Sequence, residues 1–171
     1  MEVLFETHPA IFWQSGKIDV VQHKAKVESE KVLHGDSAVD GGGMSIYGSV
    51  LHDGGVYRMW YQATPKDWDD ENMTFVAYAE SDDGFTWRKP ELGLVELGGS
   101  KANNLTNLGV HAPSVFIDPD APESHRYRAT GCLQPGIRGI HPGAEKMGYF
   151  TFHSSDGLHW NLDTTSPRWD A

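Results

Sequence analysis

Short stretches in which apolar and polar side chains alternate recur along this chain. The clearest covers residues 56–62, VYRMWYQ, and a period of two is typical of a β-strand with one buried face. The residues just before it, DGG at 53–55, favour a tight hairpin turn, so we expect residues 45–52 to form the partner strand. No stretch has the convincing pattern of a long amphipathic helix. The hydrophobic pattern therefore predicts short antiparallel strands.

One sequence pattern occurs twice. Residues 81–87 and 154–160 both match S-x-D-G-x-x-W and lie 73 residues apart. Two segments upstream also correspond, in the same order: GSVLHD at 48–53 with PSVFID at 113–118, and YRMW at 57–60 with YRAT at 127–130. Three features in one order at similar spacing indicate a repeated structural unit.

Each repeat predicts four strands. We expect them at 45–52, 56–62, 73–81 and from 85 in the first repeat, and at 114–117, 126–131, 147–154 and 158–160 in the second. Four short antiparallel strands joined by tight turns are typical of a β-propeller blade. We therefore predict an all-β fold, a single partial β-propeller domain over residues 1–171. It would have blade-like units at about 45–90 and 112–165, an N-terminal segment at 1–44, and the start of a third blade near Arg168 and Trp169.

The repeated turn has a mechanical interpretation. An Asp side chain accepts backbone N–H groups within the turn, and the Gly after it adopts positive φ without strain. The Trp three residues later can cover the hairpin and fill the space between blades. We therefore predict scaffold roles for both copies, Asp83, Gly84 and Trp87, and Asp156, Gly157 and Trp160.

The amino-acid composition argues against several classes of function. The chain has 171 residues and a formal net charge of −10, which repels phosphate backbones and anionic lipid, so we expect neither nucleic acid nor a membrane as partner. Cys132 is the only cysteine, which excludes an intrachain disulfide and a cysteine-based zinc site. Residues 1–6, MEVLFE, lack the features of a signal peptide, although a processed secreted form would look the same. We expect a soluble protein whose compartment stays open.

Residues 47–62, YGSVLHDGGVYRMWYQ, resemble the first blade of five-bladed propeller glycoside hydrolases of the invertase/levanase and arabinanase/xylosidase superfamily. Residues 78–95, followed by Asn103 and Asn104, are similar to a bacterial invertase-domain-like subgroup. The resemblance covers about residues 30–165 and implies glycoside hydrolysis, or binding of an oligosaccharide, at the propeller axis. A closed ring with about 70 residues per blade needs about 350 residues. A homo-oligomer or a missing C-terminal half would therefore have to complete the propeller.

Two positions depart from the family pattern. The family has an Asp that acts as nucleophile or base just before the glycine that corresponds to Gly48, where this chain has MSIY at 44–47 and no carboxylate. Its second-blade motif has an Asp where this chain has Ala112. Three interpretations therefore stay open: an oligosaccharide hydrolase, a non-catalytic sugar-binding or assembly module, and a truncated inactive propeller fragment.

Glycoside hydrolysis needs two carboxylates beside the scissile bond. The nearest ones before the first expected strand are Asp36 and Asp40, in a glycine-rich loop that lets the backbone bend. We predict that one of them acts as base or nucleophile, with ordinary turn residues as the alternative. His111 occupies the position of the family's charged motif, where it could assist as acid or base or bind a hydroxyl. The alternative is a hydrogen-bonded loop histidine.

Five residues are candidate substrate contacts: Ser45, Tyr47, Trp68, Arg138 and His141. Tyr47, together with Trp60, could offer an aromatic face to a sugar, but the usual burial of large aromatic residues favours packing in the core or between blades. Arg138 and His141 belong to the long loop of residues 131–148, and long loops on rigid scaffolds often carry function.

Trp68 lies in an acidic run, DWDDEN at 67–72, whose oxygen atoms could hold Ca²⁺. The spacing does not match an EF-hand loop, and a solvated loop is the alternative. The nine histidines show no zinc-binding spacing. We therefore predict no metal site and no cofactor, with calcium at this run as the one open possibility.

Overall fold

The computed structural model describes Lys24, Lys26 and residues 31–66, 75–133, 141, 146–164 and 167–169. The chain divides into two units, residues 1–31 and 32–171. All described strands belong to the second unit.

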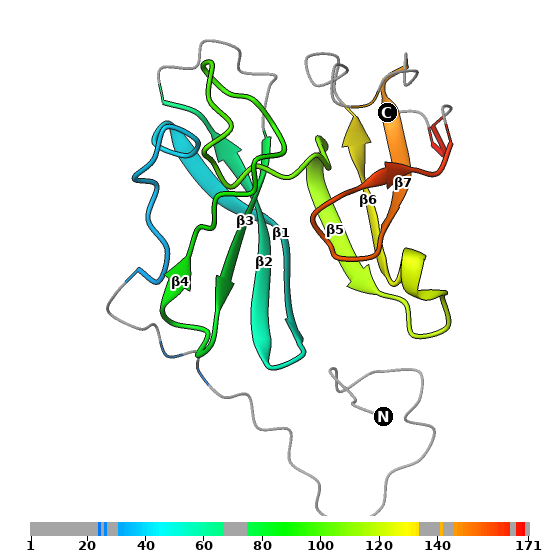
Figure 1. The fold of residues 1–171 in the computed structure, drawn as a ribbon, viewed down its shortest axis with the longest axis horizontal. Helices are drawn as coiled ribbons and strands as arrows, with labels where there is room; N and C mark the ends of the chain where they lie inside the picture. The colour runs from blue at the N-terminus through cyan, green and yellow to red at the C-terminus, as the bar shows by residue number, and fades with distance from the viewer. Residues whose placement is uncertain are drawn as a thin grey trace, which may run out of the picture. The chain divides into compact units, whose positions relative to one another are not determined.

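Two four-stranded antiparallel sheets form this unit (Figure 1). In the first, β1 (Gly43–Asp53), β2 (Val56–Thr64), β3 (Phe75–Ser81) and β4 (Trp87–Arg88) lie side by side in chain order. In the second, β5 (His111–Ile117), β6 (Tyr127–Leu133), β7 (Gly148–Ser154) and β8 (Asn161–Leu162) repeat that order, with a short 3₁₀ helix, η1 (Glu123–His125), before β6. The predicted all-β fold with two units of blade-like sheets is confirmed.

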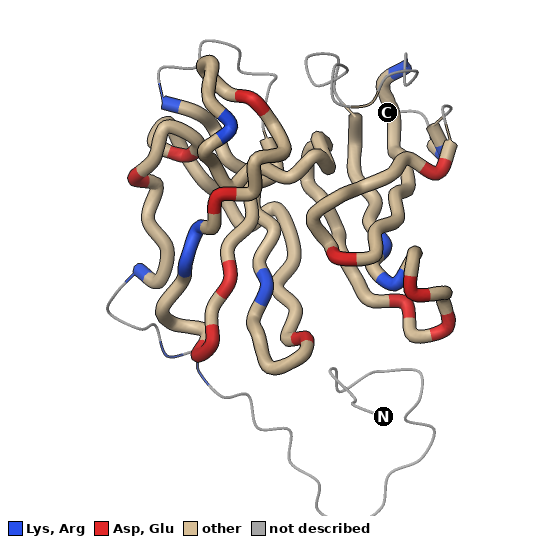
Figure 2. The backbone as a smooth tube through the Cα atoms, viewed as in Figure 1, with Lys and Arg blue, Asp and Glu red and all other residues tan. Residues whose placement is uncertain are grey.

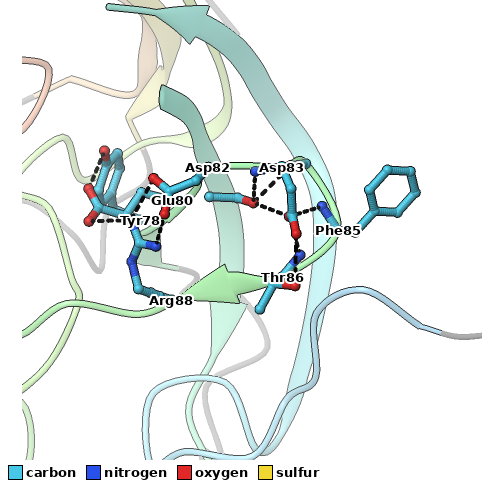
Figure 3. A network of polar contacts seen from close by, with 9 residues as sticks. Tyr78, Glu80, Asp82, Asp83, Phe85, Thr86 and Arg88 are labelled. Atoms are coloured by element: carbon cyan, nitrogen blue, oxygen red, sulfur yellow. Dashed lines mark hydrogen bonds and ion pairs between the residues drawn. The ribbon is translucent and has the colours of Figure 1, made fainter. Parts of the chain in front are cut away.

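The repeated turn sets where the fourth strand of each sheet begins. Asp83 Oδ1 accepts the N–H groups of Phe85 at 2.7 Å and Thr86 at 2.6 Å, and Gly84 has φ +77° (Figure 3). These bonds, with Thr86 first, hold the pKa of Asp83 far below its usual value. Because the two amides are bound inside the turn, β4 begins only at Trp87, two residues after the predicted start.

The second copy of the turn corrects one prediction. Asp156 Oδ1 accepts the N–H groups of Leu158 at 2.8 Å and His159 at 2.9 Å, and Gly157 again has φ +77°. Leu158 and His159 are therefore part of the turn, residues 158–160 form no strand, and β8 begins at Asn161. The prediction of a scaffold turn is confirmed, while the predicted strand boundary is wrong for the same reason.

The first sheet receives this second turn on one of its faces. The Trp60 indole, which is fully buried, donates to the Gly157 carbonyl at 2.7 Å, and Arg58 Nη1 donates to the Asp156 carbonyl at 3.4 Å. Trp60 and Tyr78 of the first sheet share one hydrophobic cluster with Phe152 and Trp160 of the second. The two sheets are therefore joined by a continuous core.

A charged contact closes the same interface at the β1–β2 hairpin. Asp53 accepts two hydrogen bonds from Arg126, at 2.9 and 2.6 Å, and one from the Tyr127 hydroxyl. The bonds from Arg126 and then Tyr127 hold the pKa of Asp53 far below its usual value. The side chain of Asp53 is only 15% exposed, so the pair is shielded from much of the solvent.

Acidic residues of the described part gather mainly in the turns and loops at strand ends (Figure 2). The β1–β2 turn, the β3–β4 turn and the β5–β6 loop all carry them: Asp53; Asp82 and Asp83; Asp118, Asp120 and Glu123.

Candidate functional site

The first strands of both sheets are bulged at corresponding places. The register of β1 against β2 slips between Ser45 and Ser49, and that of β5 against β6 slips between His111 and Ser114. In the sequence repeat, Ser49 corresponds to Ser114, so each bulge comes just before the same position of the unit. A β-bulge turns side chains out of the regular ladder and is frequent beside functional sites. The two strands are neighbours, since Val115 N–H donates to Ser49 Oγ at 2.8 Å.

The bulge in β1 depends on Gly48. A β-carbon at this position would lie 1.9 Å from the carbonyl oxygen of Trp60, which is closer than any side chain permits. The backbone of β1 therefore approaches β2 closely here, and the two residues before Gly48 face outward. Tyr47 is 63% exposed and Ile46 is 60% exposed.

The bulge in β5 contains a strained residue. Ala112 has φ +49°, the left-handed conformation that non-glycine residues seldom adopt. Its N–H donates to Gln62 Oε1 at 2.8 Å. Gln62 Nε2 in turn donates to the carbonyls of Phe75 at 3.3 Å and Val110 at 3.2 Å. One side chain from the first sheet thus holds the strand of the second on which His111 lies.

A hollow of about 280 Å³ opens where the two bulges meet. Its lining consists of Gly43, Met44, Ser45, Tyr47, Gln62, Thr64 and His111. The rings of Tyr47 and His111 meet edge to face, with 6.1 Å between their centres. The structure thus brings together three of the predicted site residues, Ser45, Tyr47 and His111. An aromatic ring beside an imidazole, a hydroxyl and an amide can stack on an apolar face and hydrogen-bond polar groups of one small ligand.

Asp36 and Asp40, the predicted catalytic carboxylates, lie elsewhere. Asp40 is 1% exposed and bound by Lys89 at 2.7 Å, the Tyr61 hydroxyl at 2.8 Å and Ser37 Oγ at 2.7 Å. Burial raises the pKa of Asp40, but the hydrogen bonds from Lys89, Ser37 and Tyr61 outweigh burial and leave the pKa below its ordinary value. Asp36 is exposed and also pairs with Lys89, at 2.7 Å.

Lys89 therefore joins the two carboxylates at the start of the described chain. Burial lowers the pKa of Lys89, but its bonds to Asp36 and Asp40 raise that pKa above the usual value. Asp36 and Lys89 line one hollow, and Lys89, Glu91 and Asn103 line another. Neither carboxylate lines the hollow beside Tyr47 and His111. Their catalytic role stays a prediction.

His141, another predicted contact, does not line the hollow. His141 is 6% exposed, packs against Phe152 with 4.9 Å between ring centres, and donates from Nε2 to the Leu108 carbonyl at 2.8 Å. Burial lowers the pKa of His141. This is the environment of a core histidine whose ring nitrogen has a hydrogen-bond partner. The role of His141 in binding stays a prediction. Trp68, Arg138 and the acidic run at 67–72 lie outside the described residues.

The described residues contain no group of three or more His, Cys, Asp or Glu side chains that could hold a metal ion. In the same part of the chain, no helix combines the length and the apolar character that a membrane crossing requires.

Gln62 and Thr64 are lining residues that the sequence pattern did not single out. Gln62 is 3% exposed in a strand whose other buried positions are mainly apolar, such as Tyr61 and Ala63. A lone amide in an otherwise apolar run is the signal that could have drawn attention to it, because a buried amide requires hydrogen-bond partners.

No protein-family model matches this chain. Two uncharacterized proteins of Mycobacterium tuberculosis, MT1551 and Rv1502, are each 30% identical to it over 135 residues. The match covers 73% of this chain but 38% of each relative, so this chain spans well under half the length of the curated relatives it matches.

Two solved structures are also similar. One is a protein of Bacteroides thetaiotaomicron provisionally assigned as a glycosidase, with TM-score 0.44, 16% identity, and coverage of 68% of this chain and 31% of that one. The other comes from the GH130 family of mannoside phosphorylases, which contains glycoside hydrolases that target β-1,2 mannosidic linkages in Candida mannan. Its TM-score is 0.43, with 16% identity and coverage of 68% and 30%. TM-scores of this size do not establish a shared fold, so the fold assignment rests on the two sheets themselves.

Proposed function

We propose that this chain is part of a carbohydrate-active protein and that the hollow between the two bulges binds an oligosaccharide. The observation that carries the proposal is the meeting of Tyr47 and His111, from two sheets, on the wall of one hollow. Sugar rings present apolar C–H faces that stack on aromatic rings, and their hydroxyls bond to imidazole, hydroxyl and amide groups. Tyr47 supplies the first kind of contact, and His111 and Ser45 supply the second.

A sugar array followed by calorimetric titration tests this proposal. Tyr47→Ala and His111→Ala should each weaken binding of the selected oligosaccharide about tenfold, since each removes about 1–1.5 kcal/mol of stacking or hydrogen bonding. Phe85→Ala is the matched control, because Phe85 is a 64% exposed aromatic residue on the β3–β4 turn. No bound sugar, or equal affinities for the wild type and both site variants, would overturn the proposal.

Hydrolysis of the bound sugar is the second candidate function, and it rests on the resemblance to glycoside hydrolases. In that case Asp36 or Asp40 acts as base or nucleophile, with His111 assisting. Because the described residues lining the hollow include no carboxylate, binding without turnover is the better-supported function. Turnover of aryl glycosides by the wild type, lost in Asp36→Asn or Asp40→Asn, would favour hydrolysis instead.

The finer assignment to the invertase/levanase and arabinanase/xylosidase superfamily remains a proposal based on the family resemblance. It includes a ring completed by further copies of the chain or by a C-terminal half. Exposed apolar side chains near β7 support a covered face there, since Met147, Tyr149 and Trp169 are 46%, 44% and 62% exposed. Light scattering tests the homo-oligomer: a monomeric mass together with a cooperative melt would contradict it.

A further inference from the structure

Gln62 is a buried side chain whose two polar ends are both engaged. It lies on β2 of the first sheet, yet two of its hydrogen bonds join it to backbone groups of Val110 and Ala112, at the start of the second sheet. The oxygen of a side-chain amide accepts and its nitrogen donates, so these partners fix which way the amide points. Val110 and Ala112 are the two residues on either side of His111. Gln62 therefore forms hydrogen bonds with the backbone immediately before and after His111.

One of these hydrogen bonds is made by Ala112, the one described non-glycine residue with positive φ. The left-handed conformation of Ala112, with φ +49°, is strained for an alanine, because its β-carbon comes close to the following carbonyl oxygen. Strained conformations persist only where their surroundings hold them in place. The hydrogen bond from Ala112 N–H to Gln62 Oε1, at 2.8 Å, is the contact that stabilises this conformation. Without it, we expect the strand to relax toward regular pairing and His111 to leave its place opposite Tyr47.

We propose that Gln62 is a positioning residue that aims His111 into the hollow, and this proposal rests on the function proposed above. Gln62 also lines the hollow itself, so it couples the strained bulge to the binding surface. The prediction concerns orientation: the histidine has its binding geometry because an amide from the neighbouring sheet holds the backbone on both sides of it.

Gln62→Met tests the proposal because it keeps the length and burial of the side chain but removes both hydrogen-bonding ends. We expect loss of the nuclear Overhauser contact between the His111 and Tyr47 rings, and about tenfold weaker sugar binding. Leu105→Ala is the matched control, since Leu105 is fully buried in the core on the other face of the first sheet. It should lower the melting temperature while keeping the ring contact and the affinity. An intact ring contact in Gln62→Met would overturn the proposal.

A double-mutant cycle separates positioning from general stability. If Gln62 acts through His111, then Gln62→Met combined with His111→Ala should bind sugar no more weakly than His111→Ala alone. Additive losses would overturn the proposal. Gln62→Asn, which keeps an amide but shortens its reach, replaces Gln62→Met if that variant does not fold. Because the ring contact is measured without sugar, a failure of the proposed binding function would leave the positioning result readable.

Discussion

Asp53 offers a direct test of how the two sheets are held together. Its carboxylate accepts three hydrogen bonds from residues at the start of β6, two from Arg126 and one from Tyr127. In Asp53→Asn, one of the two oxygens becomes an NH₂ group, which cannot accept from either partner. Hydrogen bonds to charged groups each contribute about 1.5–3 kcal/mol. Arg126 is 31% exposed, so water replaces part of this loss, and we expect a decrease of about 2–3 kcal/mol in the free energy of unfolding.

The same residue predicts a particular pH dependence. Because the pKa of Asp53 is lower in the folded protein than in the unfolded chain, its contribution is fully present above the unfolded value of about 3.9 and is lost as the pH falls through the folded value. The difference in unfolding free energy between the wild type and Asp53→Asn should therefore be constant from about pH 7 to 5 and shrink below about pH 4.

Urea unfolding at several pH values measures both effects. Asp82→Asn is the matched control, because Asp82 pairs with Arg88 in the first sheet but its side chain is 70% exposed. We expect this control to change stability little, since exposed ion pairs contribute little. If Asp53→Asn is no more destabilising than Asp82→Asn, or if the difference does not shrink in acid, the account of this interface is wrong.

Three further predictions concern other positions. Gly157→Ala should destabilise the protein by about 1–3 kcal/mol more than Gly84→Ala in urea unfolding. Both glycines have φ +77°, but a β-carbon at Gly157 would lie 2.8 Å from the Trp60 side chain, whereas at Gly84 the nearest side chain would be 3.8 Å away. Equal losses of stability in the two variants would contradict the close packing of the Gly157 turn against Trp60. Gly48→Ala should cost about 3 kcal/mol or more, because the atom it meets is the backbone carbonyl of Trp60, and amide chemical shifts should show a changed β1 bulge. Burial lowers the pKa of His141 in the folded protein, so the contribution of this residue to stability is lost as the pH falls below the unfolded value of about 6.5. The stability difference between the wild type and His141→Gln should therefore decrease as the pH falls from 7 to 5, and a constant difference would contradict this.

The strands could be predicted because their signals are local. The alternation over residues 56–62 and the Asp-Gly turns depend on neighbours in the sequence, so β2 begins at the predicted Val56. The predicted fourth strand of the second repeat, at 158–160, is wrong because Asp156 binds the amides of Leu158 and His159 within the turn. The S-x-D-G-x-x-W pattern indicates this turn, whereas strand propensity does not.

The candidate site could be predicted only in part, because its geometry depends on contacts between distant residues. Tyr47 and His111 come together through two bulges, one requiring the approach of Gly48 to Trp60 and the other requiring Gln62 to reach Ala112. No periodicity encodes such contacts. Asp40 next to a glycine resembles an ordinary turn residue, and its burial follows from Tyr61 and Lys89, which are far away in the sequence.

The joint between the sheets has a direction. One sheet contributes the Trp60 indole and the Asp53 carboxylate, and the next contributes a turn carbonyl at Gly157 and the Arg126 guanidinium, so the two sides of a unit are chemically different. A two-fold axis would bring identical sides together and leave these donors and acceptors unmatched. Any association through the same chemistry must therefore be head to tail, and such a polarity either closes on itself after a fixed number of units or continues as a filament.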